Sequence, residues 1–182
     1  MKRFTLSLLL LVLSFSFVNA QKYLTRTGHI WFYSHTPVED IEAHNHQSMS
    51  VLNLENGEMA FQVLMKSFQF EKALMQEHFN EKYVESDRYP KATFQGKIED
   101  FESLDLTADG EYEVTVTGDL TIHGVTQSVT TKGTLKVSGG DIGAISTFVV
   151  KPADYDISIP SIVRDKIAEE IEVTVDLTYQ MM

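Results

Sequence analysis

The 182-residue sequence contains no cysteine, and it has only four prolines and one tryptophan. Without cysteine, the chain cannot form disulfides, use a thiol nucleophile, attach haem through cysteine or build a cysteine-based zinc site. Basic residues are also scarce, since 15 Lys and Arg stand against 26 Asp and Glu. This excess of acid repels phosphate backbones and anionic lipid head groups. We therefore expect no nucleic-acid partner and no docking on a membrane through a basic patch.

The first twenty residues show the three-part pattern of a cleavable secretion signal. Two basic residues precede an apolar run from Phe4 to Val18, and Ala20 supplies the small residue at the cleavage site. The run is too short for a transmembrane helix, which needs about 20 residues. We predict a signal peptide over residues 1–20 and a single β-barrel domain over residues 21–182. The processed chain is expected in the periplasm or outside the cell, without stable membrane insertion, and loss of two positive charges takes its formal charge from −11 to −13.

Alternation of apolar and polar residues dominates the rest of the sequence and is typical of strands with one face in water. The clearest predicted strands are Glu111–Ile122, Met59–Met65, Lys91–Ile98 and Ile167–Tyr179. Shorter candidates are His29–Tyr33, Ile41–Asn45, Met49–Leu54, Val125–Val137 and Ile142–Val150. Turn signals stand at His123-Gly124, Asn56-Gly57 and Gly139-Gly140, where glycine permits tight hairpins. The pattern predicts eight or nine antiparallel strands.

One segment breaks the alternation. From Phe70 to Phe79, apolar residues recur at helical spacing, which predicts a helix of two to three turns; a weaker helix is predicted near Ser161–Lys166. An all-β fold with one internal helix fits either a barrel or a sandwich. Periodicity does not decide between them, or between a filled interior and one that holds a ligand.

Polar residues offer two weaker interpretations. His44 and His46 share one face of a predicted strand with Glu42, and such groups can form a zinc or copper site. They are equally well explained as the solvated face of a strand. Asp154 and Asp156 could serve as an acid and base pair in hydrolysis, or lie on the outer face of a strand. We assign no catalytic residue and no metal ligand, and keep His44 and His46 as an alternative.

The large apolar side chains also allow two interpretations. They are either a packed core or the wall of an elongated lipid pocket, for which flexible Met and flat aromatic groups are well suited. The expected lining residues of such a pocket are Phe61, Val63, Met65, Phe68, Phe70, Met75, Phe79, Phe94, Val114, Val116, Leu120, Phe148 and Tyr155.

Several segments resemble the YceI-like family. They are Leu74-Met75 with His78-Phe79-Asn80, the stretch Tyr89–Phe94, the stretch Gly118–Thr126 with the sequence GDLTIHGVT, Asp154–Ile157 and the closing Ile171–Val175. Their order and spacing match over roughly residues 23 to 180. The resemblance implies an extended eight-stranded antiparallel barrel similar to lipocalins, with a polyisoprenoid lipid bound inside it in the periplasm.

The function expected from this resemblance is an exported binding protein that carries or stores an isoprenoid-type lipid. The expected partner is a long-chain isoprenoid lipid or quinone, and no other cofactor and no enzymatic activity are expected. The sequence does not decide whether the protein forms a homodimer. Two alternatives are a metal-binding or hydrolytic envelope protein that uses outer-face His and Asp residues, and a packed β scaffold that binds another envelope protein.

Overall fold

The structure is a computed structural model that describes residues 22–182; the predicted signal peptide lies outside the described residues. Nine strands and one α-helix lie among these residues. Their bounds are β1 Lys22–His35, β2 Asp40–Asn53, β3 Glu58–Leu64, β4 Gln69–Phe70, α1 Ala73–His78, β5 Lys91–Ile98, β6 Gly110–Ile122, β7 Val125–Ser138, β8 Asp141–Val150 and β9 Ile171–Met181. Short 3-10 turns lie at Met65–Ser67, Phe101–Ser103, Pro152–Tyr155 and Ser161–Val163.

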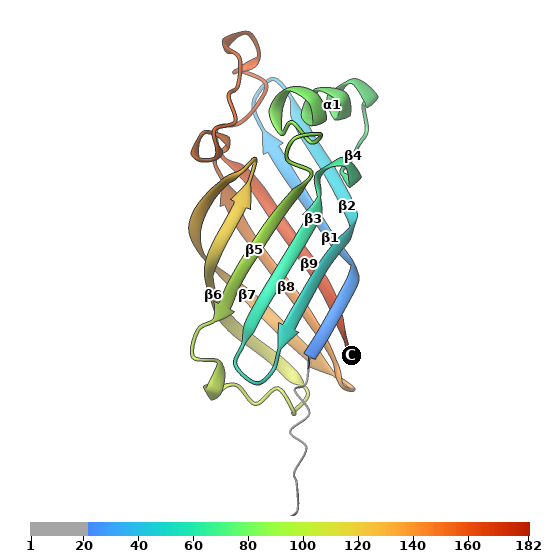
Figure 1. Ribbon diagram of the computed structural model, residues 1–182, viewed down its shortest axis with the longest axis vertical. Helices are drawn as coiled ribbons and strands as arrows, with labels where there is room; N and C mark the ends of the chain where they lie inside the picture. Colours follow the sequence, from blue (N-terminus) through green and yellow to red (C-terminus); the bar gives the residue numbers. More distant parts are fainter. Residues whose placement is uncertain (1–21) are drawn as a thin grey trace, which may run out of the picture.

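Eight of the strands close into a barrel in which all neighbours are antiparallel. The order around the ring is β1-β9-β8-β7-β6-β5-β3-β2, and β1 pairs with β2 to complete it. The two-residue β4 attaches to β2. This arrangement confirms the predicted fold class, an eight-stranded antiparallel barrel with one short helix (Figure 1).

The predicted hairpin at His123-Gly124 shows how sequence fixes register. Both residues have positive φ, 52° and 78°, as a tight two-residue turn between right-twisted strands requires. Ile122 therefore pairs with Val125, and the ladder continues without a break to Gly110 and Val137. Along β6 the alternation predicted from sequence places Val114 and Leu120 in the interior.

The prediction of two strands between Ile41 and Leu54 was wrong, because β2 is continuous and bulged. Ile30 pairs with Asn45 and Gly28 with Ser48, so β2 contains one residue more than β1 between these two pairs. The extra residue switches the inward positions from odd to even numbers, which breaks the alternation in the sequence. His46, at the bulge, is exposed.

Two further boundaries differ from prediction. Phe70 pairs with Ala43 in β4, so the helix begins at Ala73, and it continues through a wider π-helical turn to Tyr83. The last strand begins at Ile171, four residues later than predicted. The backbone before Ile171 is held by a side chain, since the Ala168 N–H donates a hydrogen bond to Ser34 Oγ at 2.9 Å.

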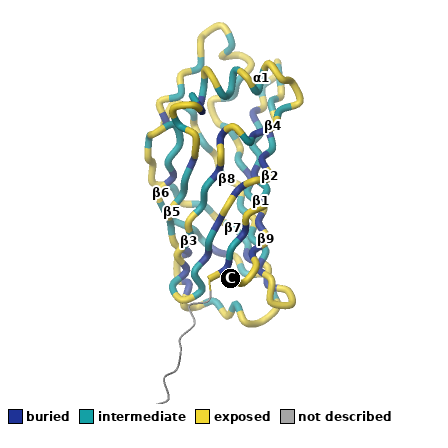
Figure 2. Tube along the Cα trace, turned by 45° about the vertical axis from the view of Figure 1, so that its right-hand side comes forward, coloured by how far each residue is buried: buried dark blue, intermediate teal, exposed yellow. Residues whose placement is uncertain are grey.

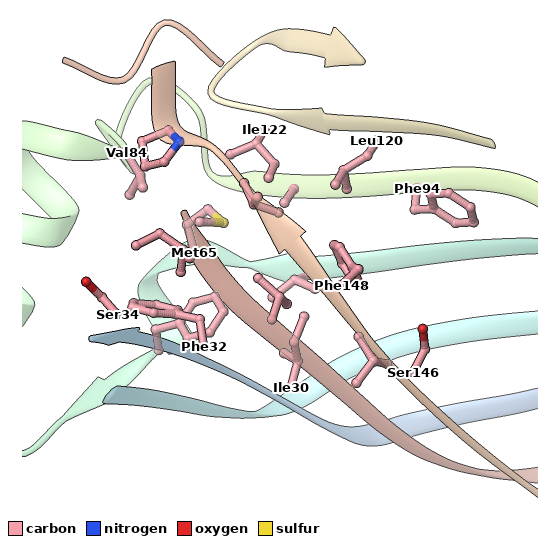
Figure 3. Close-up of a pocket in the computed structure, with 18 of the residues that line it drawn as sticks. Ile30, Phe32, Ser34, Met65, Val84, Phe94, Leu120, Ile122, Ser146 and Phe148 are labelled. Carbon is pink, nitrogen blue, oxygen red and sulfur yellow. The ribbon is translucent and has the colours of Figure 1, made fainter. Parts of the chain in front are cut away.

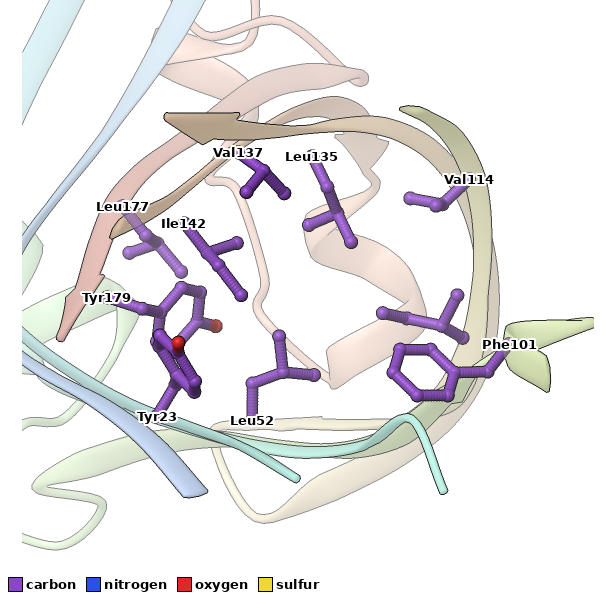
Figure 4. Packing of buried hydrophobic residues seen from close by; sticks show 10 residues of the cluster. Tyr23, Leu52, Phe101, Val114, Leu135, Val137, Ile142, Leu177 and Tyr179 are labelled. Atoms are coloured by element: carbon purple, nitrogen blue, oxygen red, sulfur yellow. The ribbon is translucent and has the colours of Figure 1, made fainter. Parts of the chain in front are cut away.

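Both ends of the described chain lie at the barrel end opposite α1 (Figures 1 and 2). At that end a packed cluster fills the interior (Figure 4). It is formed by Tyr23, Leu52, Ile98, Phe101, Val114, Leu135, Val137, Ile142, Leu177 and Tyr179. We call this region the packed end.

A loop and two tyrosines complete the packed end. Phe101, from the connection between β5 and β6, lies so close to Gly57 that a Cβ there would approach its ring to 2.5 Å. The hydroxyls of Tyr179 and Ser50 are 2.6 Å apart, and burial raises the pKa of Tyr179 to about 12. Tyr23 donates to the Gly140 carbonyl at 3.1 Å. The barrel is thus closed at this end by inserted side chains that are hydrogen-bonded where polar.

Candidate functional site

The part of the barrel toward α1 encloses a cavity of about 530 Å³, which is bordered by Met75 and His78 of α1 and reaches down to Ile98, Val114, Leu135 and Leu177 of the packed cluster. We call this part the hollow end. Its volume lies within the range of about 300–1,000 Å³ that is usual for small-molecule sites. Twelve of the thirteen residues expected from sequence line it, namely Phe61, Val63, Met65, Phe68, Phe70, Met75, Phe79, Phe94, Val114, Val116, Leu120 and Phe148. Figure 3 shows Met65, Leu120 and Phe148 directed into this space. Their role in ligand binding stays a prediction.

Tyr155 is the exception and does not line the cavity. It is buried in the 3-10 turn after β8, where its carbonyl oxygen lies 3.0 Å from His123 Nδ1. The His123 ring in turn packs edge-on against Tyr89 at 4.5 Å. Three segments of the family pattern therefore meet around His123 and tie together the rim of the hollow end. Sequence spacing did not indicate this contact.

Two residues of β1, Ile30 and Phe32, were missed as cavity residues. Phe32 contacts the rings of Phe68, Phe70 and Phe79 at centroid distances of 5.4 to 5.7 Å, and it lines the cavity with Ile30. Offset and edge-to-face contacts of this kind stabilise by about 0.5–1.5 kcal/mol each beyond burial. The alternation in His29–Tyr33 already pointed Ile30 and Phe32 to one face and would have identified both.

Phe94 owes its position to two glycines. Gly96 of β5 and Gly118 of β6 are register partners, and a Cβ on either would approach the Phe94 ring to 2.4 Å and 2.7 Å respectively. A Cβ on Gly118 would also come within 2.4 Å of the Gln95 carbonyl oxygen. The ring thus covers a stretch of bare backbone, as aromatic residues do over strand glycines, and shapes the cavity wall there.

Charged groups occur at the mouth. Glu39 and Lys166 border the cavity, and so does His78 of α1. Lys72 Nζ donates to Glu39 Oε1 at 2.9 Å, and this bond, with smaller contributions from the charges of Lys72 and Lys166, lowers the pKa of Glu39. The mouth therefore offers one carboxylate, already paired, beside cations that can contact a polar head group.

Polar groups within the cavity wall are few and are hydroxyls. Thr93, Thr131 and Ser146 are examples. Thr131 Oγ1 and Ser146 Oγ lie 3.2 Å apart. Such a wall suits a hydrocarbon guest, because it leaves few buried polar groups unpaired.

The histidines considered for metal binding, His44 and His46, lie on β2 beside His29 of β1. His29 Nε2 is 3.0 Å from His44 Nδ1, and the rings of His29 and His46 stack at 4.1 Å. Burial, followed by the charges of His46 and His44, lowers the pKa of His29, which Asp176 partly offsets. Within residues 22–182, no group of three or more His, Asp or Glu side chains is arranged to hold a metal ion. A metal role for His44 and His46 stays an untested prediction.

No helix among the described residues has the length and apolar character to cross a membrane.

The chain belongs to the YceI-like domain family, whose model matches residues 21–179. A curated relative, the UPF0312 protein VPA0850 of Vibrio parahaemolyticus, is 30% identical over 83 residues. That alignment covers 42% of this chain and 40% of the relative, so the match spans less than half of the relative's length.

Solved structures share the fold. A polyisoprenoid binding domain from Saccharophagus degradans, described as implicated in plant cell wall breakdown, superposes with a TM-score of 0.78 at 17% identity and covers 90% of this chain and 100% of its own. BcnA of Burkholderia cenocepacia gives 0.67 at 15% identity, over 83% and 95% of the two chains. The Campylobacter jejuni YCEI protein gives 0.61 at 17% identity, over 81% and 88%. At these identities the likeness extends to the fold.

Proposed function

We propose that this protein is an exported, non-enzymatic carrier or store of an isoprenoid-type lipid, with the lipid tail in the hollow end of the barrel. The observation that carries the proposal is the apolar cavity of about 530 Å³ that opens at the α1 mouth. Membership in the YceI-like family supports it, as does the fold shared with a polyisoprenoid binding domain. A fully packed scaffold would not leave this space, since protein interiors are normally close-packed.

The free energy of moving the hydrocarbon tail does not by itself explain which lipid would be selected. Moving hydrocarbon out of water gains about 0.8 kcal/mol per CH₂, but an isoprenoid lipid starts in a membrane that is already apolar. Transfer from the membrane into the barrel is then nearly neutral in hydrophobic terms. The shape of the cavity and contacts from residues such as Lys166 and His78 must therefore select the lipid. The protein would let such a lipid cross an aqueous gap.

The direct test is native mass spectrometry of the protein purified from its own envelope, followed by organic extraction. We expect a stoichiometric long-chain apolar ligand. Leu120→Trp, which fills the cavity, should lose that ligand, whereas the matched change Asp119→Trp on the outer face should keep it. An empty protein that also takes up neither an isoprenoid quinone nor a prenyl phosphate would contradict the proposal.

A further inference from the structure

The barrel wall is split between β7 and β8. Their ladder runs from Ser138 and Asp141 to Gly133 and Ser146 and then ends. Beyond that point residues 125–132 still pair with β6, and residues 147–150 still pair with β9. Two strands that are each fully paired on their other side thus diverge toward the α1 end. We call the gap between residues 125–132 and residues 147–150 the window.

Side chains close the window below and above. At its base, Ser146 Oγ donates to the Lys132 carbonyl at 2.7 Å. At its top, Gln127 Nε2 donates to the Asp154 carbonyl at 2.7 Å, which holds the turn after β8 against β7. The window is therefore bounded and lies below the rim of the hollow end.

The cavity borders the window on both sides, because Val129 and Thr131 of β7 and Phe148 and Val150 of β8 line it. Thr134 and Ile145 are register partners that belong to the outward-facing set of their strands, because Leu135, Ile142 and Val137 face inward. Both nevertheless border the same cavity as the inward-facing Phe148. Outside the barrel, Ile145 just below the window and Val149 beside it are 48% and 53% exposed, so two apolar side chains flank the window on the outer surface.

The packed end blocks the axis of the barrel. Leu52 and Tyr179 are fully buried below the cavity, and Phe101 lies there too. A tail longer than the cavity cannot continue in that direction without displacing these close-packed side chains.

We propose that the window is a lateral portal through which the distal part of a long isoprenoid tail leaves the barrel and lies against Ile145 and Val149. This inference rests on the proposed lipid-binding function and extends it. Its consequence is tolerance of tail length, since the cavity holds the segment near the head group and the remainder passes out sideways. An eight-unit tail should then bind as well as a four-unit tail.

The test uses the absence of native cysteine. Val149→Cys places a thiol on the outer side of the window, away from the cavity lining, and a bulky maleimide attached after folding would block the window from outside. Lys97→Cys is the control, because Lys97 is exposed on the outer face of β5, away from the window. Dissociation constants are measured for isoprenoid quinones with four and with eight prenyl units.

We expect labelling at Val149→Cys to weaken binding of the eight-unit quinone at least tenfold and that of the four-unit quinone less than threefold, with no change at labelled Lys97→Cys. Equal effects on both tail lengths, or no effect on either, would overturn the portal. Failure of the unmodified protein to bind either quinone would instead count against the proposed function, which separates the two outcomes.

Discussion

The packed end and the hollow end are built from the same eight strands, yet one is filled and the other is open. At the packed end, Phe101 from the β5–β6 connection inserts among the strand residues. At the hollow end, the helical segment α1 and the turn at Pro152–Tyr155 lie over the rim (Figure 1). The difference teaches that alternation builds the wall of a barrel, whereas its connections decide whether the interior is filled. Stability and binding can then reside in different parts of one fold.

The largest difference in the free energy of unfolding is expected when a leucine is replaced by alanine at each end of the barrel. Leu52→Ala at the packed end should lower the free energy of unfolding by about 2–5 kcal/mol, because Leu52 is fully buried. Leu120→Ala should lower it less, because Leu120 already faces the cavity. Urea denaturation with and without an isoprenoid quinone checks both, and the quinone should stabilise the Leu52→Ala variant as much as the unmodified protein. Equal losses at the two sites would contradict the comparison.

A glycine substitution should distort the hollow end specifically. Gly118→Ala is expected to destabilise by about 1–3 kcal/mol and to weaken quinone binding, since its Cβ would meet the Gln95 carbonyl and the Phe94 ring. Gly143→Ala is the control, because its Cβ would find ordinary contacts of 3.7 Å or more. Thermal unfolding and a quinone titration measure the two effects. Unchanged binding in Gly118→Ala would show that Phe94 does not shape the site.

Sequence predicted most of this architecture, because alternation survives wherever a strand is regular. It failed at the β2 bulge, where one extra residue near His46 inverts the inward set. It also failed at Tyr155, which is buried and whose carbonyl oxygen contacts His123 of a distant hairpin. The sequence also did not predict the window, because the alternation of inward and outward residues in β7 and β8 continues past the point where the two strands stop pairing. Features that depend on which strand lies opposite leave no local signal.

Removing one hydroxyl at the packed end should have a smaller effect. Tyr179→Phe is expected to cost about 1 kcal/mol, with no change in lipid affinity, because Tyr179 OH bonds Ser50 Oγ away from the cavity. Its pKa of about 12 exceeds the ordinary value of 10, so the unfolded state ionises first. The contribution of Tyr179 to the free energy of unfolding is fully present below pH 10 and is lost as the pH rises toward 12. The Tyr179→Phe variant should not show this alkaline decrease in stability. Alkaline denaturation curves of the two proteins that coincide would contradict this.

The smallest effect concerns the outer face of β1. The pKa of His29 lies below its ordinary 6.5, so the unfolded state binds the proton more readily and stability falls as the pH drops through this range. His44, His46 and Asp176 contribute charge around it. Denaturation midpoints above and below pH 6.5 should therefore differ less in His29→Gln than in the unmodified protein. An unaltered difference would remove His29 as a source of acid sensitivity.

The central claim is that lipid occupies the hollow end and leaves the packed end untouched. Methyl NMR of isoleucine-labelled protein during titration with an isoprenoid quinone tests it most directly. The account predicts that the methyl signals of Ile30 and Ile122, which line the cavity, shift and show contacts to the ligand, while that of Ile142 in the packed cluster stays in place. Unshifted signals from Ile30 and Ile122, or ligand contacts at Ile142, would contradict it.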